Sequence, residues 1–333
     1  MSAERARKIL VTGGLGFIGY HLAERLSRDA ATELVLVDNL ARGRIDADAE
    51  ALLARPNVRF VQADLADPAV WPTVGRGYDE VYHFVAVIGV SNVIQRPEAV
   101  LRVNALSVIH LLDWFNSGGG ERLLFPSTSE AYAWTQQFHP LPVPTPEDVP
   151  LAISDVANPR ASYAGSKIFG ELAVTHACGR AGKGFAIVRY HNVYGPRMGT
   201  QHVIPELHHR SAFEKQNPLV VFSPDHSRAF CYVDDAVEAT IRALRVEQAA
   251  NRTFNIGNDR EEVAIADLAA RILDIAGIDA KIVGRPAAND PIARRCPDIS
   301  RARSVLAYEP QVDLHHGLRR TMAWYERYYR ERS

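Results

Sequence analysis

The sequence predicts an α/β fold with a doubly wound parallel sheet in the first part of the chain and a smaller lobe after it. Up to about residue 190, short β-rich segments alternate with helical segments. This alternation is typical of a parallel sheet with crossover helices. Near-continuous apolar segments, such as Ile-Leu-Val and Leu-Val-Leu-Val, suit strands that are covered on both faces.

The predicted elements place the domain boundary near residue 190. After Tyr190 the alternation becomes irregular, which assigns residues 1–189 to a nucleotide-binding domain, with later segments returning to it, and residues 190–333 mainly to a substrate-binding lobe. The proline-rich segment Phe138–Pro159 should contain no regular element. The predicted strands are Lys8–Thr12, Leu34–Asp38, Val58–Gln62, Glu80–Val85, Arg122–Pro126 and Phe185–Tyr190. The predicted helices are Gly19–Arg28, Val100–Asn116 and Tyr163–Ala181.

Composition excludes several classes of partner. The chain has 38 basic and 39 acidic residues and a net charge of −1, so we expect neither a nucleic acid nor a membrane as partner. The three cysteines, Cys178, Cys231 and Cys296, have no metal-ligand spacing, and their odd number argues against a disulfide framework. We therefore expect no metal site and a cytoplasmic location. No segment approaches the roughly 18 apolar residues of a membrane span.

A glycine-rich loop follows the first predicted strand and opens a helix, in TGGLGFIGYHLAERL. Gly13, Gly16 and Gly19 have a spacing that suits dinucleotide binding. The first permits a tight turn, the second lets the backbone approach a pyrophosphate, and the third lets the helix pack on the strand. The pyrophosphate would lie at the positive end of the helix. The sequence thus predicts a Rossmann-like cofactor site.

Two aspartates follow the next two strands. Asp38, in LVLVDNL, lies about 20 residues beyond the glycine loop, where a carboxylate accepts hydrogen bonds from the adenosine ribose and repels a 2′-phosphate. This favours NAD over NADP, although Arg42 and Arg44 lie nearby and an arginine could tolerate the phosphate. Asp64, in QADLAD, has two open interpretations, a contact with the adenine or a helix cap.

A possible catalytic set follows the fifth predicted strand. The segment Ser127–Glu130 ends this strand, at the sheet edge where ligands bind in such folds. Tyr163 and Lys167 are spaced i and i+4 and therefore share a helix face. We expect the ammonium to lower the pKa of the phenol from near 10 towards neutrality. With Thr128 orienting the substrate hydroxyl, this set would deprotonate an alcohol while a hydride leaves its carbon.

These motifs resemble the extended short-chain dehydrogenase/reductase family, in particular its NAD-dependent sugar-nucleotide epimerases, dehydratases and decarboxylases. The resemblance covers nearly the whole chain, through TGGLGFIG, DNL, VYHFVA, PSTSEAY, SYAGSK, RYHNVYGPRM, SRAFCYVDDAVEA, NIGN, RRCPDISRARSVLAYEP and GLRRT. It implies bound NAD, a nucleotide diphosphate sugar as substrate and a homodimer formed through paired helices. It also implies catalysis by Thr128, Tyr163 and Lys167, with Ser129 and Glu130 beside them. The cofactor-binding residues that it adds are Phe17, Ile18, Asn39, Leu65, Val85 and Asn104.

The resemblance also implies substrate contacts in the second lobe. Asn192 and Arg228 would contact the diphosphate and Arg294 could join them, because arginine matches phosphate geometry. Other interpretations stay open. Arg228 could instead pair with Asp225 or Asp234, and Arg294 could be a solvated surface charge.

Neighbouring residues have mainly structural interpretations. We expect His191 to be packed and hydrogen-bonded rather than a base. Asp234 and Asp235 should cap the helix that follows them. The segment Val203–Pro205 fits a nucleotide pocket and an ordinary core equally well.

The relatives share a first step, oxidation of a sugar carbon, usually C4, and differ in the later steps. A 4-epimerase needs nothing beyond the shared set, so an epimerase of a UDP-hexose or UDP-hexuronic acid is the first interpretation. FPSTSE, FCYVDD and Arg160, three residues before Tyr163, resemble the UDP-uronic acid decarboxylases, which come second. Arg160 and Arg228 would suit a carboxylate. A 4,6-dehydratase comes third, because Ser129 and Glu130 replace its Asp-Glu pair.

Two hypotheses belong to other classes. An NAD(P)-dependent alcohol reductase with exchangeable cofactor would be expected to use NADP and to have an apolar second lobe. Asp38 and the many arginines and histidines of that lobe count against it. A noncatalytic NAD-sensing module would lack part of the Thr/Tyr/Lys set, and all three residues are present.

Overall fold

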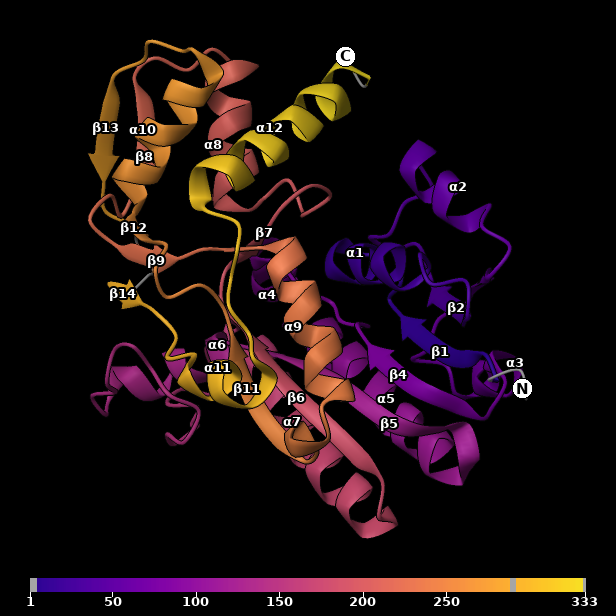
Figure 1. The fold of residues 1–333 in the computed structure, drawn as a ribbon. Coiled ribbons are helices and arrows are strands. Elements are labelled where there is room, and N and C mark those ends of the chain that lie inside the picture. The colour runs from indigo at the N-terminus through magenta and orange to yellow at the C-terminus, as the bar shows by residue number, and fades with distance from the viewer. Residues whose placement is uncertain (1–4, 288–291, 332–333) are drawn as a thin grey trace. The chain divides into compact units, whose positions relative to one another are not determined.

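The computed structural model describes residues 5–287 and 292–331. The strands of its largest sheet are β1 (Arg7–Thr12), β2 (Thr32–Asp38), β3 (Val58–Gln62), β4 (Tyr78–His83), β5 (Gly120–Thr128), β6 (Gly184–Tyr190) and β11 (Arg252–Ile256). They lie in the order β11-β6-β5-β4-β1-β2-β3 (Figure 1). The pairs β1–β2, β1–β4, β2–β3 and β4–β5 are parallel. Because the order reverses at β1, the sheet is doubly wound, and the predicted Rossmann-like fold class is confirmed.

Two strand ends differ from the prediction and both bear on the site. β5 continues to Thr128 instead of ending at Pro126. β4 ends at His83, so the predicted strand end at Val85 is wrong. The Phe84 amide still donates to the Thr12 carbonyl at 2.8 Å, and farther along the Val87 amide donates to a side chain, the Asn104 Oδ1, at 2.7 Å.

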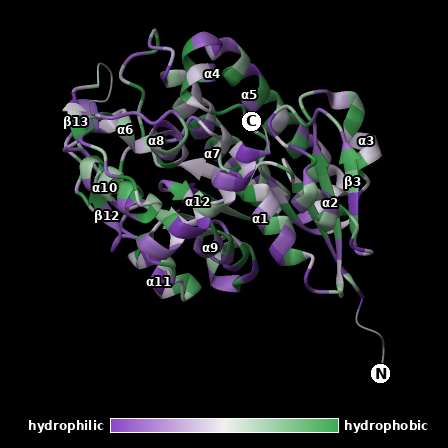
Figure 2. Cartoon of the chain, turned by 90° about the horizontal axis from the view of Figure 1, so that it is seen from above, coloured by the Kyte–Doolittle hydropathy of each residue, from purple (hydrophilic) through white to green (hydrophobic). Residues whose placement is uncertain are grey.

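Eight α-helices of the described part of the chain accompany this sheet. α1 begins at Phe17 rather than at Gly19, directly after an extended Gly16. α7 ends where Gly182 takes up a left-handed conformation, which glycine adopts without strain. Several helices carry both hydrophobic and hydrophilic residues (Figure 2), as expected of helices that cover a sheet. The helices are α1 (Phe17–Leu26), α2 (Ala47–Leu53), α3 (Trp71–Val74), α4 (Val90–Gln95), α5 (Pro97–Trp114), α6 (Glu130–Ala133), α7 (Ala161–Ala181) and α9 (Val233–Arg245).

The main core cluster joins the sheet to α5 and α7, which pack against each other. Fully buried side chains of this kind contribute roughly 1.5–3 kcal/mol each. Trp71 and Trp114 lie at one end of the cluster, with ring centroids 5.2 Å apart. The cluster includes Leu10, Val35, Val37, Val81, Leu111, Leu123, Phe125, Val174 and Ile187.

The chain divides into two compact units. Unit 1 comprises Met1–Ala131, Asp155–Arg189 and Val237–Phe254, and unit 2 comprises Tyr132–Ser154, Tyr190–Ala236 and Asn255–Ser333. The proline-rich segment predicted to be irregular contains no helix or strand, apart from an isolated bridge between Thr145 and Pro297.

Unit 2 is built from short strands and longer helices around a core that includes the buried Tyr194, Tyr232 and Tyr325. Among the described helices of both units, none is long and apolar enough to cross a membrane. The elements of unit 2 are β7 (Val193–Tyr194), α8 (Val203–Ala212), β8 (Leu219–Phe222), β9 (Ser227–Ala229), β10 (Cys231–Tyr232), β12 (Glu262–Ala264), α10 (Ile265–Ala276), β13 (Ile282–Arg285), β14 (Arg294–Arg295), α11 (Ser300–Leu306) and α12 (Leu314–Arg330).

Candidate active site

The glycine loop between β1 and α1 packs closely against neighbouring backbone. Gly13 has a φ of +67°, and a Cβ there would lie 2.7 Å from the carbonyl carbon of Phe84. A Cβ on Gly19 would collide with the Gly13 carbonyl oxygen. A Cβ on Gly16 would meet only that oxygen, at 3.3 Å. Gly13 and Gly19 therefore serve close packing, whereas the absent side chain of Gly16 leaves space beside the loop for a ligand.

Asp38 ends β2 and holds this loop through its carboxylate. Oδ2 accepts a hydrogen bond from the Leu15 amide at 3.0 Å, and Oδ1 accepts one from the Leu40 amide at 2.8 Å. Burial raises the pKa of Asp38, whereas these amides act to lower it. Because a carboxylate offers about four acceptor positions, capacity remains for ribose hydroxyls.

Asn104 ties α5 to α7 beside the predicted site. Its Oδ1 accepts the Val87 amide, and its Nδ2 donates to the Val87 carbonyl at 3.3 Å and to Ser166 Oγ at 3.0 Å. Ser166 precedes Lys167 on α7. These contacts position the chain after β4, and a contact of Asn104 with the cofactor stays a prediction.

The other predicted cofactor residues lie in varied surroundings. Phe17 and Ile18 open α1 and are half-buried, as is Val85, whereas Asn39 is exposed. Leu65 is buried in the main core cluster. The exposed Asp64 accepts the Ala66 amide at 3.0 Å, and the short helix that follows is capped by Asp67 instead. The helix-cap interpretation of Asp64 is therefore wrong.

Thr128 and Tyr163, two members of the predicted catalytic set, lie together. Thr128 is the last residue of β5, Tyr163 lies in the first turn of α7, and their side chains hydrogen-bond to each other. The Thr128 hydroxyl also accepts the Glu130 amide at 3.2 Å. Burial raises the pKa of Tyr163 to about 12; the Glu130 carboxylate acts in the same direction and Arg42 in the opposite one. A tyrosine and a threonine thus lie where both can contact one substrate hydroxyl.

The predicted effect of Lys167 on the pKa of Tyr163 is wrong. The Lys167 Nζ donates to the Pro126 carbonyl oxygen at 2.8 Å, and the cation that acts on the phenol is Arg42. Burial lowers the pKa of Lys167 to about 8. Helical spacing places the two side chains on one face, but desolvation of the phenolate outweighs the nearby positive charge.

His83 lies near Lys167 and contacts the residue before the glycine loop. Sequence reasoning missed this residue. It ends β4, and its Nδ1 lies 2.8 Å from Oγ1 of Thr12, the residue before Gly13. Burial lowers the pKa of His83 to about 3, and the charge of Lys167 acts in the same direction. The signal was a histidine at the carboxyl end of an apolar strand. His83 therefore places the lysine of α7 near the end of β1.

Further predicted residues surround the Thr128–Tyr163 pair in unit 1. Ser129 is buried after the end of β5, and Glu130 begins α6. Arg160 occupies the position before α7, and its amide donates to Asn158 Oδ1 at 3.0 Å. The structure therefore brings all five predicted catalytic residues to one edge of the sheet.

The predicted substrate residues Asn192, Arg228 and Arg294 belong to unit 2. Asn192 has a φ of +39°, and its Nδ2 donates to the Ala229 carbonyl at 3.0 Å. Arg228 is buried, and one guanidinium nitrogen donates to the Ser227 carbonyl at 2.8 Å and to the Ala293 carbonyl at 3.2 Å. Strands β9 and β14 place Arg228 and Arg294 in one small sheet.

Arg294 differs from Arg228 because it is exposed and bound to a carboxylate. Its Nε and Nη2 donate to the two Glu262 oxygens at 2.8 and 2.9 Å, and this pairing lowers the pKa of Glu262. Such an ion pair matches the surface-charge interpretation more closely than the ligand interpretation.

Three structural expectations for unit 2 have separate outcomes. His191 is buried, with its Nε2 3.1 Å from Asn255 Oδ1, as expected of a packed histidine. Ile204 is fully buried in α8, which fits the core interpretation. Asp234 and Asp235 lie inside the first turn of α9 rather than ahead of it, and Asp235 accepts two backbone amides near residue 311. The expectation that they cap this helix is therefore wrong.

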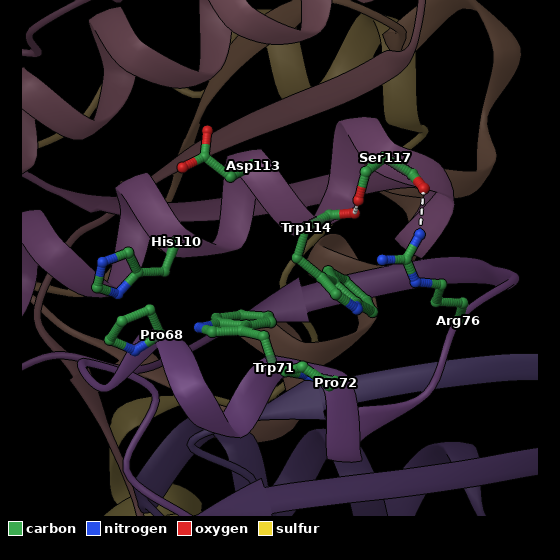
Figure 3. A pocket seen from close by; sticks show the side chains of 8 residues that line it. All are labelled: Pro68, Trp71, Pro72, Arg76, His110, Asp113, Trp114 and Ser117. Atoms are coloured by element: carbon green, nitrogen blue, oxygen red, sulfur yellow. Dashed lines mark hydrogen bonds between the residues drawn. The ribbon is translucent and has the colours of Figure 1, made fainter.

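A pocket elsewhere in unit 1 is lined by none of the predicted site residues (Figure 3). Trp71 and Trp114 lie side by side in it, and Arg76 donates to the Ser117 carbonyl at 2.6 Å. Its lining residues are Pro68, Trp71, Pro72, Arg76, His110, Asp113, Trp114 and Ser117.

The residues at the sheet edge fit a dinucleotide. The space beside the Gly16 Cα is little obstructed, the first turn of α1 presents amide groups that lack acceptors within the helix, and Asp38 ends β2 at the ribose position. Among the described residues, no group of three or more His, Cys, Asp or Glu side chains could hold a metal ion. The arrangement suits hydride chemistry with proton transfer at Tyr163.

Comparisons with known proteins agree with this fit. The model of the NAD dependent epimerase/dehydratase family matches residues 9–257. The UDP-N-acetyl-alpha-D-glucosaminuronate decarboxylase of Bacillus cytotoxicus is 30% identical over 330 residues, which cover 96% of this chain and 98% of the relative.

Two solved structures share the whole fold. One is the UDP-glucose 4-epimerase of Thermotoga maritima with UDP-glucose, with a TM-score of 0.84, 27% identity and coverage of 97% of this chain and 99% of the other. The second is the UDP-glucuronic acid 4-epimerase of Bacillus cereus in complex with UDP-glucuronic acid and NAD. Its TM-score is 0.84 at 25% identity, with coverage of 97% and 100%.

Fold and site together define an NAD-dependent enzyme of the extended short-chain dehydrogenase/reductase group. The chain belongs to the NAD dependent epimerase/dehydratase family. NAD is its cofactor.

Proposed function

We propose that this enzyme is a UDP-sugar 4-epimerase whose substrate is a UDP-hexose or a UDP-hexuronic acid. The observation that carries the proposal is the hydrogen bond between Thr128 and Tyr163 at the carboxyl end of β5. Lys167, one turn beyond Tyr163 on α7, lies near His83, which contacts Thr12 directly before the glycine loop. The proton acceptor and the cofactor loop therefore lie at the same edge of one sheet.

Each residue of this set has a distinct task. Thr128 orients the sugar 4-hydroxyl, and Tyr163 takes its proton. When bound, NAD accepts the hydride from C4 and returns it later, and its oxidised ring carries a positive charge. Because burial raises the pKa of Tyr163 to about 12, additional positive charge must favour the phenolate before it can act as a base. Arg42 is the cation that the structure places near the phenol, and Lys167 lies one turn further along α7 on the same helix face.

Epimerisation requires the smallest set of groups. Tyr163 returns its proton to O4 after the 4-keto sugar has turned its other face towards the hydride. No further acid is needed, so Thr128 and Tyr163 suffice as the groups that contact O4. The solved epimerases with 25% and 27% identity support this order of candidates.

Decarboxylation of a UDP-hexuronic acid is the second candidate. A 4-keto group makes the sugar acid a β-keto acid, which loses carbon dioxide, and the resulting enolate takes a proton at C5 before the ketone is reduced. Glu130 lies close enough to Tyr163 to affect its pKa, and Arg160 precedes the same helix. The decarboxylase relative with 30% identity favours this candidate.

Mass spectrometry of a nucleotide-sugar panel separates the candidates. The purified protein is incubated with UDP-, dTDP-, GDP- and ADP-sugars, including the uronic acids. The masses of the products are measured, and the products are separated by chromatography. Epimerisation leaves the mass unchanged, decarboxylation removes carbon dioxide, and dehydration removes water. Turnover of a free alcohol without turnover of any activated sugar would overturn the proposal.

The substrate diphosphate is assigned to residues of unit 2. We propose that Arg228 and Asn192 bind it, because a buried guanidinium gives stronger charge-assisted hydrogen bonds than an exposed one. Arg228 is 9% exposed, and Asn192 lies in the segment before β7. Arg294 would bind the diphosphate only if it gave up its ion pair with Glu262.

We also propose a homodimer formed through α4, α5 and α7. These helices carry large hydrophobic side chains that are unusually exposed. Sedimentation should give twice the chain mass, and Leu172→Glu should reduce it to that of a monomer. The exposed side chains are Val90 at 60%, Ile94 at 45%, Leu101 at 46%, Ile109 at 40%, Phe169 at 39% and Leu172 at 56%.

The enzyme is assigned to the cytoplasm as part of the same proposal. All three cysteines are buried and unpaired, as is common in a reducing compartment. Fractionation of cells that express the tagged chain tests this location, and recovery outside the cytoplasm would contradict it.

A further inference from the structure

Three residues one turn apart on α7 face the end of β5. Tyr163, Lys167 and Glu171 are spaced i, i+4 and i+8, and such residues share one face of a helix. Tyr163 bonds to Thr128 of β5, and Lys167 bonds to the Pro126 carbonyl of the same strand. A Cβ on Gly170 would collide with the ring of Phe125, so the helix lies as close to the strand as a glycine allows.

Glu171, the third residue of this face, is buried, and both of its oxygens have partners. Ser127 of β5 donates to Oε1 at 2.5 Å. Arg189 of β6 donates from Nε to Oε1 at 2.9 Å and from Nη2 to Oε2 at 2.6 Å. Glu171 is 8% exposed and Arg189 is 6% exposed. A buried carboxylate keeps its charge only when it is paired and hydrogen-bonded in this way.

Lys167 lies between titratable groups on two elements. On α7, Tyr163 precedes it by one turn and Glu171 follows it by one turn; on β4, the neutral His83 faces it. Burial lowers the pKa of Lys167 to about 8, and the Glu171 carboxylate is the group that raises it. The charge state of Lys167 near neutral pH therefore depends on Glu171.

We infer that Glu171, held in place by Arg189 and Ser127, is a positioning residue that acts through Lys167 and keeps its ammonium protonated where the Pro126 carbonyl binds it at the end of β5. The inference rests on the proposed function for the catalytic meaning of Lys167. Glu171 touches none of the reacting atoms and acts through the ammonium alone. Arg189 and Ser127 fix the carboxylate rather than the lysine.

The sign of the expected change follows from these charges. Removing the negative charge of Glu171 leaves desolvation unopposed, so Lys167 loses its proton at a lower pH. We expect the pKa of Lys167 to fall by roughly one unit in Glu171→Gln, since an opposite charge at close range shifts a pKa by about one to three units. At about pH 8 the protonated fraction would then fall by about fivefold, and at about pH 6 hardly at all.

Lysine side-chain NMR measures this change without a substrate. The chain has only five lysines, so labelled lysine gives few signals, and Lys167→Met assigns the one of interest. Glu171→Gln should move the Lys167 titration to lower pH and leave that of Lys183 in place. Glu50→Gln, which neutralises an exposed carboxylate on α2, is the matched control and should move neither.

A second variant covers the risk that an unpaired Arg189 prevents folding. Glu171→Gln combined with Arg189→Met removes both charges of the pair at similar volume, and the Lys167 titration should again move to lower pH. An unchanged Lys167 titration in whichever of these variants folds would overturn the inference. Absence of nucleotide-sugar turnover in the wild-type enzyme would instead overturn the proposed function, and the NMR result would stand.

Where a substrate is turned over, activity gives a second readout. The alkaline limb of the kcat pH profile should move to lower pH in Glu171→Gln, with a loss of about fivefold near pH 8. A loss that is equal at all pH values would indicate a merely structural role for Glu171 and would contradict the inference.

Discussion

The proposed catalytic residues of unit 1 and the proposed substrate-binding residues of unit 2 differ in how far the chain itself fixes their side chains. In unit 1, Tyr163 and Lys167 each bind the end of β5, and Glu171 on the same helix face is bound from two strands. In unit 2, Arg228 is buried against backbone carbonyls, whereas Arg294 is exposed and bound to Glu262. The groups for the chemical step are thus preorganised, while the proposed substrate contacts combine one fixed cation with one that is already paired.

The largest expected effect tests the preorganised catalytic residues of unit 1. Tyr163→Phe removes the proton acceptor but keeps the ring, so turnover should fall by roughly 10²–10⁴-fold, as expected for loss of general base catalysis. Bound NAD, measured by its release on heating, should stay at the wild-type level. Full activity in this variant would show that another group takes the proton.

A smaller effect is expected where the chain fixes the cofactor loop. In Asp38→Asn, one of the two carboxylate oxygens that accept the Leu15 and Leu40 amides becomes an NH₂ group. Because NH₂ is a donor, one of these amides loses its acceptor. Leaving such amides unsatisfied costs about 1–3 kcal/mol, and NAD affinity should fall by roughly tenfold or more.

Calorimetric titration of the protein stripped of NAD measures this effect. Asp113→Asn, at an exposed aspartate of α5 in unit 1, is the matched control and should bind NAD almost as the wild type does. Unaltered NAD affinity in Asp38→Asn would remove this residue from the cofactor site.

The next effect concerns the fixed cation of unit 2. Arg228→Gln removes a charge-assisted contact with the diphosphate, which is worth about 1.5–3 kcal/mol, so KM should rise by roughly tenfold or more. The value of kcat should change less, because the diphosphate lies away from C4. Steady-state kinetics with the substrate found in the panel decides this, and a change in kcat alone would contradict the assignment.

The smallest effect is expected for the paired cation. Arg294→Gln breaks an exposed ion pair with Glu262, and such pairs contribute about 0–1 kcal/mol. We expect KM to change by less than about threefold in the same assay. A rise as large as that in Arg228→Gln would show that Arg294 exchanges Glu262 for the substrate.

The sequence predicted those parts of the site that depend on local spacing. The glycine loop, Asp38 at a strand end and the placing of Tyr163 and Lys167 on one helix face follow from strand and helix periodicities, which act over a few residues. The structure places all of them at one sheet edge. The same spacing could have predicted the position of Glu171, because this residue lies one turn beyond Lys167 on the same face of α7.

Other features depend on contacts that spacing does not reveal. The direction of the Lys167 ammonium is set by the Pro126 carbonyl, 41 residues away, and the pKa of Tyr163 is set by burial. The partner of Arg294 lies 32 residues away on another strand. The apolar strand GFAIVRY contains Arg189, and a buried arginine needs a charged or polar partner. The spacing of the sequence does not reveal that this partner is Glu171.

Deuterium at C4 of the substrate tests the central claim most directly. The enzyme is given a UDP-sugar that it turns over, labelled with deuterium at C4, and the product is analysed by NMR and mass spectrometry. Oxidation and reduction at C4 by bound NAD should return the deuterium to C4 of the product, for epimerisation and decarboxylation alike. Product that has lost this deuterium to solvent, or that carries it at another carbon, would contradict the account.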